Sequence, residues 1–314
     1  MKTFGIIIFI ILLLVLIFLI ITLIVFIHTF KRRNPVTEDD IKYYIDSHNL
    51  KEYEEEILNG INHFMNSKKE EVYITSFDGY NLKGYYLKNT NSINKTIILA
   101  HGYHSAPFFD FSIGHLEYMR LGFDLLFIEE RAHEHSEGKF TTFGMKERYD
   151  IKSWVSFVAD RYPDNDIVLA GVSMGAASTL FALGLELKDN VKCAILDCPF
   201  SNAFDEILWT VSKKRKWYVK IFINMINLYM KIFEGVSLKD TNASEVLKKN
   251  ALPIFIAHGV IDKVVPIEMA DEIYEKARGI KEYVKVENAP HAQSFIKAKD
   301  EYTSKLEAFL KKVL

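Results

Sequence analysis

The pattern of apolar and polar residues divides the chain into three parts. Residues 4–27 form an almost unbroken apolar run without a charged side chain, and a run of this length can cross a bilayer as a helix. After it comes a stretch with helical spacing, and from Glu71 onwards short apolar runs alternate with helical patterns. We therefore expect a membrane anchor with a basic flank at 1–33, a helical connector at 34–70 and one main domain at 71–314.

The connector has the pattern of a helix that begins near Thr37. Asp40 follows Thr37 by three residues, in a position like that of a capping box. Further along, acidic residues separate apolar residues that recur at helical spacing, namely Leu50, Tyr53, Ile57, Ile61 and Phe64. This pattern predicts a helical segment that docks on the main domain. The repeat is too short to favour a dimerising coiled coil.

The main domain alternates between strand and helix patterns. Residues 72–77 and 80–87 predict a β-hairpin with a turn at Asp78-Gly79. Further strands are expected at 96–100, 123–128, 167–170, 191–196, 252–257 and 283–286, and helices at 144–158, 174–183, 267–277 and 293–313. This order predicts an α/β fold, a mostly parallel sheet with helices on both faces, led by the antiparallel hairpin.

Residues 199–250 interrupt this alternation. A basic run, Lys213-Lys214-Arg215-Lys216, precedes a mostly apolar helix pattern at 217–233. The polar residues of that helix form one narrow stripe, made of Lys220, Asn224, Asn227 and Lys231. We expect a helix that packs over the functional cleft, and its wide apolar face leaves open that it also touches a membrane surface. A second membrane span is not expected, because the run is short.

Composition and charge narrow the partners and the compartment. The net charge is −2 at pH 7, so nothing predicts a nucleic-acid partner. Two cysteines, Cys193 and Cys198, allow no disulfide framework and have no zinc-type spacing.

The basic residues around the apolar run predict its orientation. Residues 31–33 are all basic, whereas only Lys2 precedes the apolar run. The positive-inside rule then predicts a single-pass protein with its main domain in the cytosol. The long apolar run without a small-residue cleavage site favours an anchor over a signal peptide.

The segment 166–183 carries the strongest chemical signal. An apolar strand pattern leads into Gly171-Val172-Ser173-Met174-Gly175, and an Ala- and Leu-rich helix pattern follows. A G-x-S-x-G between a strand and a helix is typical of a nucleophile elbow, a sharp turn that lifts the serine hydroxyl clear of the backbone. Flanking glycines let such a turn pack closely against its neighbours. We therefore predict Ser173 as a nucleophile.

The partners that a serine nucleophile needs also follow expected strands. Asp262 comes just after the strand at 252–257 and His291 just after the strand at 283–286. Because the carboxyl ends of parallel strands gather reactive residues at one edge of a sheet, we expect His291 to be the general base and Asp262 to orient it. Asp197, at the end of another strand, is the alternative acid.

Preset hydrogen-bond donors are expected beside the nucleophile. The backbone N–H of Met174 is one candidate for an oxyanion hole, and that of Tyr103, or of a neighbour in the turn at 101–104, is the second. His133 and His135 lie two residues apart without a carboxylate cluster, which favours a solvated loop over a metal site. We expect neither a metal nor a cofactor.

From about Glu71 to its C-terminus, the chain resembles the α/β-hydrolase superfamily. The resemblance rests on His101-Gly102-Tyr103, the segment 171–175, Asp262 and His291. It implies the α/β-hydrolase fold, the triad roles of a serine, an aspartate and a histidine, and a lid in the insertion at 199–250.

One branch of this superfamily is a closer match. It holds monoacylglycerol lipases, serine aminopeptidases and many bacterial hydrolases of unassigned substrate. The loop after the fourth strand in that branch usually reads R-G-x-G-x-S, and the segment 131–138 resembles it. In this chain Ala132 and Glu134 stand where that pattern has glycine.

These observations predict a membrane-anchored serine hydrolase that cleaves carboxylic esters through an acyl-enzyme. An apolar helix near the nucleophile favours a small-molecule ester or lipid with an apolar acyl group. A serine peptidase or amidase is one alternative, and it needs an acidic group to hold a free amino terminus, for which Glu129 and Glu130 are candidates. A non-catalytic, membrane-tethered scaffold on the same fold is another alternative.

Overall fold

The computed structural model describes residues 2–214 and 216–314, so Arg215 of the predicted basic run lies outside the described part. One eight-stranded sheet forms the centre of the main domain, in the order β1-β2-β4-β3-β5-β6-β7-β8. Strand β2 pairs antiparallel with β1 and β4, and the other neighbouring pairs are parallel. The strands are β1 (Glu70–Thr75), β2 (Asn81–Leu87), β3 (Lys95–Ala100), β4 (Asp124–Ile128), β5 (Asp166–Val172), β6 (Val191–Asp197), β7 (Ile254–Gly259) and β8 (Lys281–Val286). The predicted α/β class is confirmed.

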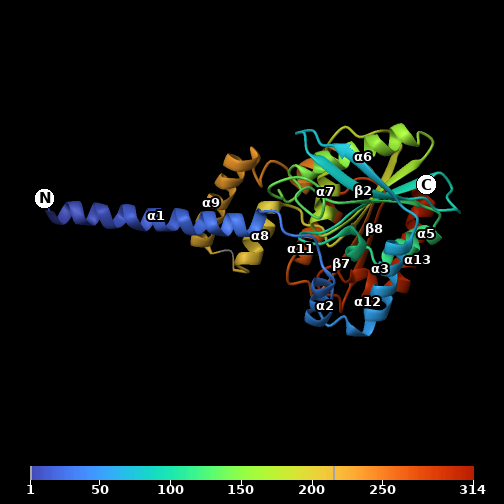
Figure 1. Cartoon of the computed structure of the whole chain (residues 1–314), viewed down its shortest axis with the longest axis horizontal. Coiled ribbons are helices and arrows are strands. Elements are labelled where there is room, and N and C mark those ends of the chain that lie inside the picture. The colour runs from blue at the N-terminus through green and yellow to red at the C-terminus, as the bar shows by residue number, and fades with distance from the viewer. Residues whose placement is uncertain (1, 215) are drawn as a thin grey trace.

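Helices cover both faces of the sheet (Figure 1). Those of the main domain are α4 (Pro107–Asp110), α5 (Gly114–Arg120), α6 (Glu147–Arg161), α7 (Met174–Ala182), α8 (Ala203–Val211), α9 (Trp217–Glu234), α10 (Ala243–Lys249), α11 (Ile267–Lys276), α12 (Ser294–Lys297) and α13 (Lys299–Val313). Neighbouring strand residues face opposite cores: Ile98 packs in the core under α6 and α7, and Ile97 in the core under α5 and α13. This alternation explains why the central strands are apolar on both sides.

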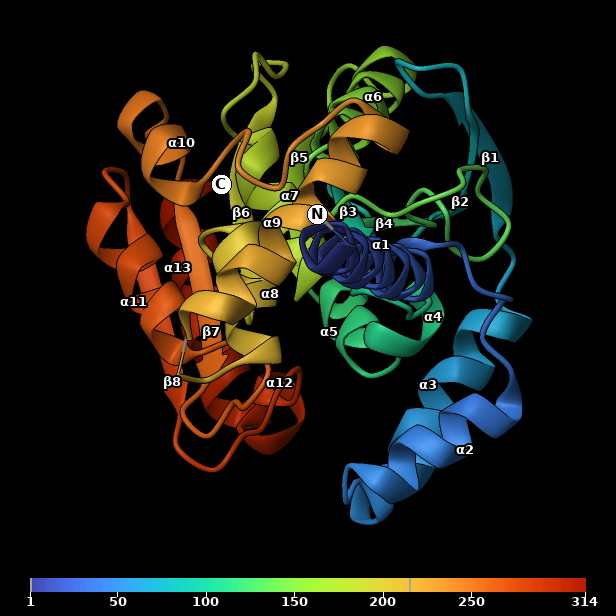
Figure 2. The same ribbon diagram turned by 90° about the vertical axis from the view of Figure 1, so that its left-hand side faces the viewer.

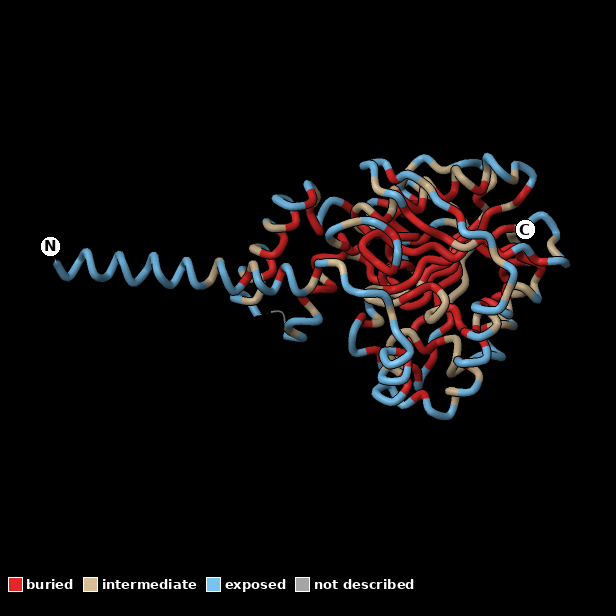
Figure 3. Tube along the Cα trace, in the orientation of Figure 1, coloured by how far each residue is buried: buried red, intermediate tan, exposed pale blue. Residues whose placement is uncertain are grey.

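Helix α1 (Lys2–Phe30) extends away from the sheet and is exposed along most of its length (Figures 1 and 3). Within the described residues it is the one helix long and apolar enough to cross a membrane. Its last turns differ from the rest, because Phe26 and Phe30 are fully buried against the main domain. The helix therefore joins the core of the domain at one end.

The connector docks on the main domain, as its pattern predicts. It consists of α2 (Glu38–Ser47), a short 3₁₀ helix η1 (Lys51–Tyr53) and α3 (Glu54–Asn66). The capping box at its start is present, with the Asp40 N–H donating to Thr37 Oγ1 and the Thr37 N–H donating to Asp40 Oδ2. Its apolar residues pack with Ile113, which lies just before α5.

Several predicted boundaries differ from the structure, and three of the differences have a clear structural reason. The hairpin loop has five residues, 76–80, because Asp78 turns aside to bind the buried guanidinium of Arg131 at 2.9 and 3.1 Å. Helix α6 starts at Glu147 and not at residue 144, because Phe143 and Gly144 adopt positive φ. The helix expected at 293–313 is divided at Ala298 into α12 and α13.

The insertion between β6 and β7 contains α8, α9 and α10. Four polar residues of α9 were predicted to form one stripe, and one of them, Asn227, is buried. Its side-chain oxygen accepts the Leu238 N–H at 2.7 Å, which satisfies the backbone after the helix. Viewed along α1, helices α8 and α9 lie beside it (Figure 2), and α9 packs directly against it.

Candidate active site

Ser173 occupies a strained turn between β5 and α7. Its backbone has φ 53° and ψ −114°, a combination that non-glycine residues rarely adopt. The flanking glycines permit the turn. A Cβ on Gly171 would lie 2.3 Å from the carbonyl group of Gly175, and a Cβ on Gly175 would lie 2.1 Å from the Ala100 carbonyl oxygen. The sequence pattern and the observed geometry therefore agree that a nucleophile elbow forms here.

The tertiary fold brings Ser173, His291 and Asp262 together. His291 Nε2 lies 2.8 Å from Ser173 Oγ, and His291 Nδ1 lies 2.7 Å from Asp262 Oδ2. With Nδ1 carrying a proton toward the carboxylate, Nε2 is free to accept the serine proton. The three residues come from the ends of β5, β7 and β8, which meet at one edge of the sheet.

The Asp262 carboxylate is held from two sides. Its Oδ1 accepts the backbone N–H groups of Val264 and Val265 at 2.8 and 3.0 Å, which leaves Oδ2 for His291. His258 Nε2 also lies 3.4 Å from Oδ2. Burial opposes ionisation, but hydrogen bonds from His258 and His291 outweigh it and lower the pKa of Asp262. The carboxyl group is therefore ionised at neutral pH.

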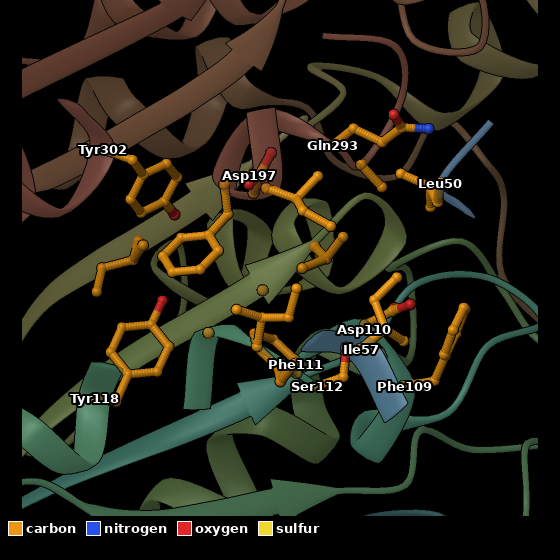
Figure 4. Close-up of a pocket in the computed structure, with 18 of the residues that line it drawn as sticks. Leu50, Ile57, Phe109, Asp110, Phe111, Ser112, Tyr118, Asp197, Gln293 and Tyr302 are labelled. Atoms are coloured by element: carbon orange, nitrogen blue, oxygen red, sulfur yellow. The ribbon is translucent and has the colours of Figure 1, made fainter. Parts of the chain in front are cut away.

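Asp197, the alternative acid, lies elsewhere. It points into a separate cavity of about 90 Å³ behind the elbow, shown with Phe111 and Tyr302 in Figure 4. Within the described residues its Oδ1 has no hydrogen-bond partner. Burial raises the pKa of Asp197 to about 6. The contact with His291 Nδ1 is made by Asp262, so the geometry favours Asp262 over Asp197 as the orienting acid.

His291 has a raised pKa. Burial disfavours the charged ring, but the ionised Asp262 carboxylate outweighs this effect. Cys198, Asp262 and His291 also offer three atoms within 4.8 Å of one another, a spacing that a metal ion would accept. Both ring nitrogens of His291 are already in hydrogen bonds with Asp262 and Ser173, so the cluster fits proton transfer better than metal binding.

Backbone N–H groups beside Ser173 are available for an oxyanion. In the turn after β3, the Gly102 N–H donates to Asp110 Oδ2 at 2.6 Å and the His104 N–H donates to His133 Nε2 at 3.0 Å. Across residues 2–214 and 216–314, the N–H groups of Tyr103 and Met174 have no acceptor. Tyr103 therefore stays the candidate partner of Met174, because the N–H groups of Gly102 and His104 are already bound.

Neutral histidines fix this turn. His101 accepts the Glu130 N–H on Nε2 and donates from Nδ1 to the Gly102 carbonyl, and His133 donates from Nδ1 to the Arg131 carbonyl. Burial lowers the pKa of both rings, which keeps them neutral. His133 therefore acts as a hydrogen-bond partner of the turn, whereas His135 of the same loop lies with Glu129 and Glu134, and these three residues offer ligand atoms within 4.8 Å of one another.

The two glycine replacements in that loop have a structural consequence. Ala132 and Glu134 adopt φ 60° and 44°, the left-handed region that the glycines of the R-G-x-G-x-S pattern would occupy easily. Glu134 Oε1 accepts the Val36 N–H at 2.8 Å, and the Glu134 carbonyl accepts Arg32. The Glu134 carboxylate, which a glycine would lack, thus adds a hydrogen bond to the segment that follows α1.

Two cavities meet at Ser173 and His291. One has a volume of about 350 Å³ and a mainly apolar wall, made of Val25, Thr29, Phe30, Tyr103, Phe143, Ser173, Met174, Phe200, Glu206, Ile207, Thr210, Val211, Phe222, Ile223, Ile226, Val264 and His291. The other, of about 240 Å³, is more polar and includes Asp40, Tyr44, His104, Ser105 and Asp110. The first volume lies within the range of ligand pockets.

Sequence reasoning missed two contributions to this site. Val25, Thr29 and Phe30 of α1 line the apolar cavity, and their apolar run gave no sign that it faces a cleft. Glu206 of α8 lines the same cavity, and no motif in the sequence distinguished it from the other polar residues of that helix. Of the described residues that line either cavity, none is Glu129 or Glu130.

The sheet order and the elbow define an α/β hydrolase, and the comparisons agree. The esterase Pf2001 of Pyrococcus furiosus superposes with a TM-score of 0.63 at 26% identity, covering 80% of this chain and 94% of that one. The α/β hydrolase GrgF from Penicillium sp. sh18 superposes with a TM-score of 0.58 at 15% identity, covering 78% and 98%. The match to Pf2001 supports the α/β-hydrolase superfamily, and the match to GrgF shows that the fold is shared.

Three further proteins that resemble this chain differ in length or are uncharacterized. The acylaminoacyl peptidase of Pyrococcus horikoshii has a TM-score of 0.56 at 18% identity, over 81% of this chain and 42% of that one. In sequence, the uncharacterized protein YqkD of Bacillus subtilis is 27% identical over 248 residues, which cover 79% of this chain and 81% of YqkD. The uncharacterized protein YfhR of Escherichia coli K12 is 24% identical over 236 residues. No family model matches the chain. The neighbours support a hydrolase.

Proposed function

We propose that the protein is a membrane-anchored serine hydrolase that cleaves carboxylic esters with apolar acyl groups. The observation that carries this proposal is the hydrogen-bonded series Asp262–His291–Ser173 on the wall of an apolar cavity. A serine hydroxyl needs an adjacent base to become nucleophilic, and the apolar wall suits an acyl chain. The esterase Pf2001 among the neighbours supports ester chemistry.

In the proposed reaction, Ser173 Oγ attacks the ester carbonyl carbon while its proton passes to His291 Nε2. The N–H groups of Tyr103 and Met174 stabilise the oxyanion. His291 then returns the proton to the leaving alcohol, and the ester bond breaks to give an acyl-enzyme. Water, deprotonated by the same imidazole, attacks the acyl-enzyme and releases the carboxylic acid. Asp262 holds the ring and stabilises its charged form.

The proposed organisation has an anchor at 1–33, a connector at 34–70 and a catalytic domain at 71–314. The basic residues after α1 support a cytosolic domain. The insertion at 199–250 supplies α8 and α9 to the apolar cavity, which supports its role as a lid. We further place the chain in the branch with monoacylglycerol lipases and serine aminopeptidases, on the loop at 131–138.

A serine peptidase is the second candidate, and one observation favours it. Glu206 is 5% exposed and lines the apolar cavity, and within the described residues its Oε2 has no hydrogen-bond partner. A carboxylate at this position is able to hold a free amino terminus. Burial, however, raises the pKa of Glu206 to about 7, which weakens it as a permanent anion. The acylaminoacyl peptidase among the neighbours shares the fold.

Labelling with a fluorophosphonate probe tests the proposed function. Membranes that hold the wild-type chain or the Ser173→Ala variant are treated with the probe, and we expect labelling of the wild type alone. Equal labelling of both would place the reactive group elsewhere. Absence of labelling in both, in membranes and in detergent with folded protein, would support the scaffold alternative. Hydrolysis of acyl esters against amino-acid amides then separates esterase from peptidase.

A further inference from the structure

We propose that the last turns of α1 form one wall of the acyl-chain site, and that the substrate enters this site laterally from the bilayer, between α1 and the helices α8 and α9. This inference rests on the proposed function and names its substrate class. The substrate is an ester of a membrane-resident acyl chain with a polar alcohol. The anchor is then part of the active site as well as a tether.

The end of α1 is hydrogen-bonded to the main domain close to the proposed active site. The Phe30 carbonyl accepts the Thr141 N–H at 2.9 Å, and the Arg32 N–H donates to the Lys139 carbonyl at 2.9 Å. The Tyr103 hydroxyl donates to the Thr29 carbonyl. These backbone contacts hold α1 in one position relative to the nucleophile, which a flexible tether would not do.

Helix α9 lies at the depth of the apolar run of α1. Tyr229 donates from its hydroxyl to the Leu19 carbonyl at 2.8 Å, and the rings of Phe18 and Phe222 pack edge to face. Residues 18 and 19 belong to the apolar run at 4–27. If α1 crosses a membrane, α9 therefore lies within or against the same leaflet.

The outer surface of α9 fits that position. It exposes large apolar or aromatic side chains, which are Trp217, Tyr218, Ile221, Leu228, Ile232 and Phe233. Trp217, at the start of the helix, is 75% exposed, and aromatic residues of this kind favour the membrane interface. Lys213, Lys214 and Lys216 precede the helix, where they suit anionic head groups. Many exposed apolar side chains on α1 and α9 are costly in water and are satisfied by lipid, whereas the exposed Lys220, Asn224 and Lys231 of α9 suit the polar head groups.

The apolar cavity opens on this same side. Three of its lining residues are exposed apolar side chains: Val25 of α1 is 36% exposed, Val211 of α8 is 55% exposed and Val264 is 40% exposed. The polar cavity shares Ser173 and His291 with the apolar one and is lined by Asp40 and Tyr44 of the connector. An amphiphile is thus expected to bind with its acyl chain toward the bilayer and its alcohol toward the connector.

A photoreactive probe tests this orientation. The full-length protein is placed in vesicles of phosphatidylcholine and phosphatidylglycerol and treated with a long-chain alkyl fluorophosphonate that carries a diazirine near its chain end. Ser173 Oγ bonds to phosphorus, fluoride leaves and His291 takes the serine proton. After illumination, mass spectrometry locates the second crosslink. We expect it in peptides of α1 or α9, including residues 25–30 and 222–226.

The outcomes separate this inference from the function on which it rests. Crosslinks in the connector, with Ser173 labelled, would overturn the inference and leave the serine hydrolase intact. Failure of the probe to label Ser173 in folded protein would overturn both.

A matched pair of variants in α1 gives an independent test. Val25 lines the cavity, whereas its neighbour Ile24 is 60% exposed and is not among the lining residues. We measure kcat/KM for p-nitrophenyl palmitate and butyrate. Val25→Trp should lower the palmitate-to-butyrate ratio by about tenfold or more, because the large ring fills the chain site. Ile24→Trp should leave the ratio near that of the wild type.

An unchanged ratio in Val25→Trp, or an equal fall in both variants, would contradict the role of α1. If Val25→Trp loses all hydrolysis, Thr29→Phe takes its place under the same criterion. That substitution keeps the Thr29 carbonyl that accepts Tyr103.

Discussion

Tyr103 links the proposed oxyanion hole to the anchor helix, since its hydroxyl donates a hydrogen bond to the Thr29 carbonyl in the last turn of α1. Tyr103 and Thr29 both line the apolar cavity, together with Ser173. One side chain therefore couples the position of the anchor to the position of a proposed transition-state donor.

The Tyr103→Phe variant tests this coupling. It keeps the backbone N–H but removes the hydrogen bond to α1, and it leaves a carbonyl without its donor. We expect a loss of about 1 kcal/mol in the free energy of unfolding, and a lower kcat for long-chain esters. Thermal unfolding in detergent and ester hydrolysis measure the two effects. Tyr43→Phe, on an exposed connector residue, is the control, and an equal response to it would contradict the coupling.

Asp262→Asn should lower kcat by about 10⁴-fold with the fold retained, because the amide no longer holds the imidazole in the tautomer that accepts the serine proton. Asp197→Asn is the matched control, since Asp197 is buried nearby but lies in the cavity behind the elbow. It should change kcat only a few-fold. The reverse ranking of the two variants, with near-normal turnover in Asp262→Asn, would assign the acid role to Asp197.

The activity should fall as the pH is lowered through the pKa of His291. The ring acts as a base only when it is neutral, and its pKa is raised above the ordinary value. The acid limb of kcat/KM is therefore expected above pH 6.5, the usual value for histidine. In Asp262→Asn the residual activity should have its acid limb at lower pH, because a partner that favours the charged ring is gone. If the acid limb of kcat/KM lies at the same pH in this variant as in the wild type, the proposed roles of Asp262 and His291 are contradicted.

Glu206→Gln distinguishes the esterase from the peptidase. Burial raises the pKa of Glu206 to about 7, so the wild-type carboxyl gains charge as the pH rises through neutrality. For esters with apolar acyl groups, the variant should retain its activity and lose less of it above pH 7, because no charge forms in the chain site. Hydrolysis of amino-acid amides should instead fall sharply if Glu206 holds an amino terminus. Loss of amide hydrolysis with ester hydrolysis unaffected would support the peptidase alternative.

Much of the fold could be predicted because it follows from local patterns. The alternation of apolar strands and amphipathic helices predicted the α/β class, and the G-x-S-x-G pattern between a strand and a helix predicted the turn at Ser173. The ends of elements were less predictable. Asp78 leaves the expected two-residue turn to bind Arg131, a partner 53 residues away along the chain. No local pattern records such a contact.

The candidate site was predictable for a related reason. Ser173, Asp262 and His291 each follow a strand, and the carboxyl ends of parallel strands lie together at one edge of a sheet. The choice between Asp262 and Asp197 depended on distance and direction in space. Two backbone N–H groups aim the Asp262 carboxylate at His291, whereas Asp197 turns into the cavity behind the elbow.

Periodicity and neighbours within a few positions were enough to predict the class of sheet, the elbow, the apolar run of α1 and the residue types available for catalysis. The packing of the folded chain established which acid meets His291, that Asn227 is buried, and that Val25 and Thr29 line the cavity at Ser173. Residues 25 and 173 are distant in the chain, and their proximity depends on how α1, α8 and α9 pack. The sequence of an apolar run does not distinguish whether its side chains contact lipid, a protein core or a substrate.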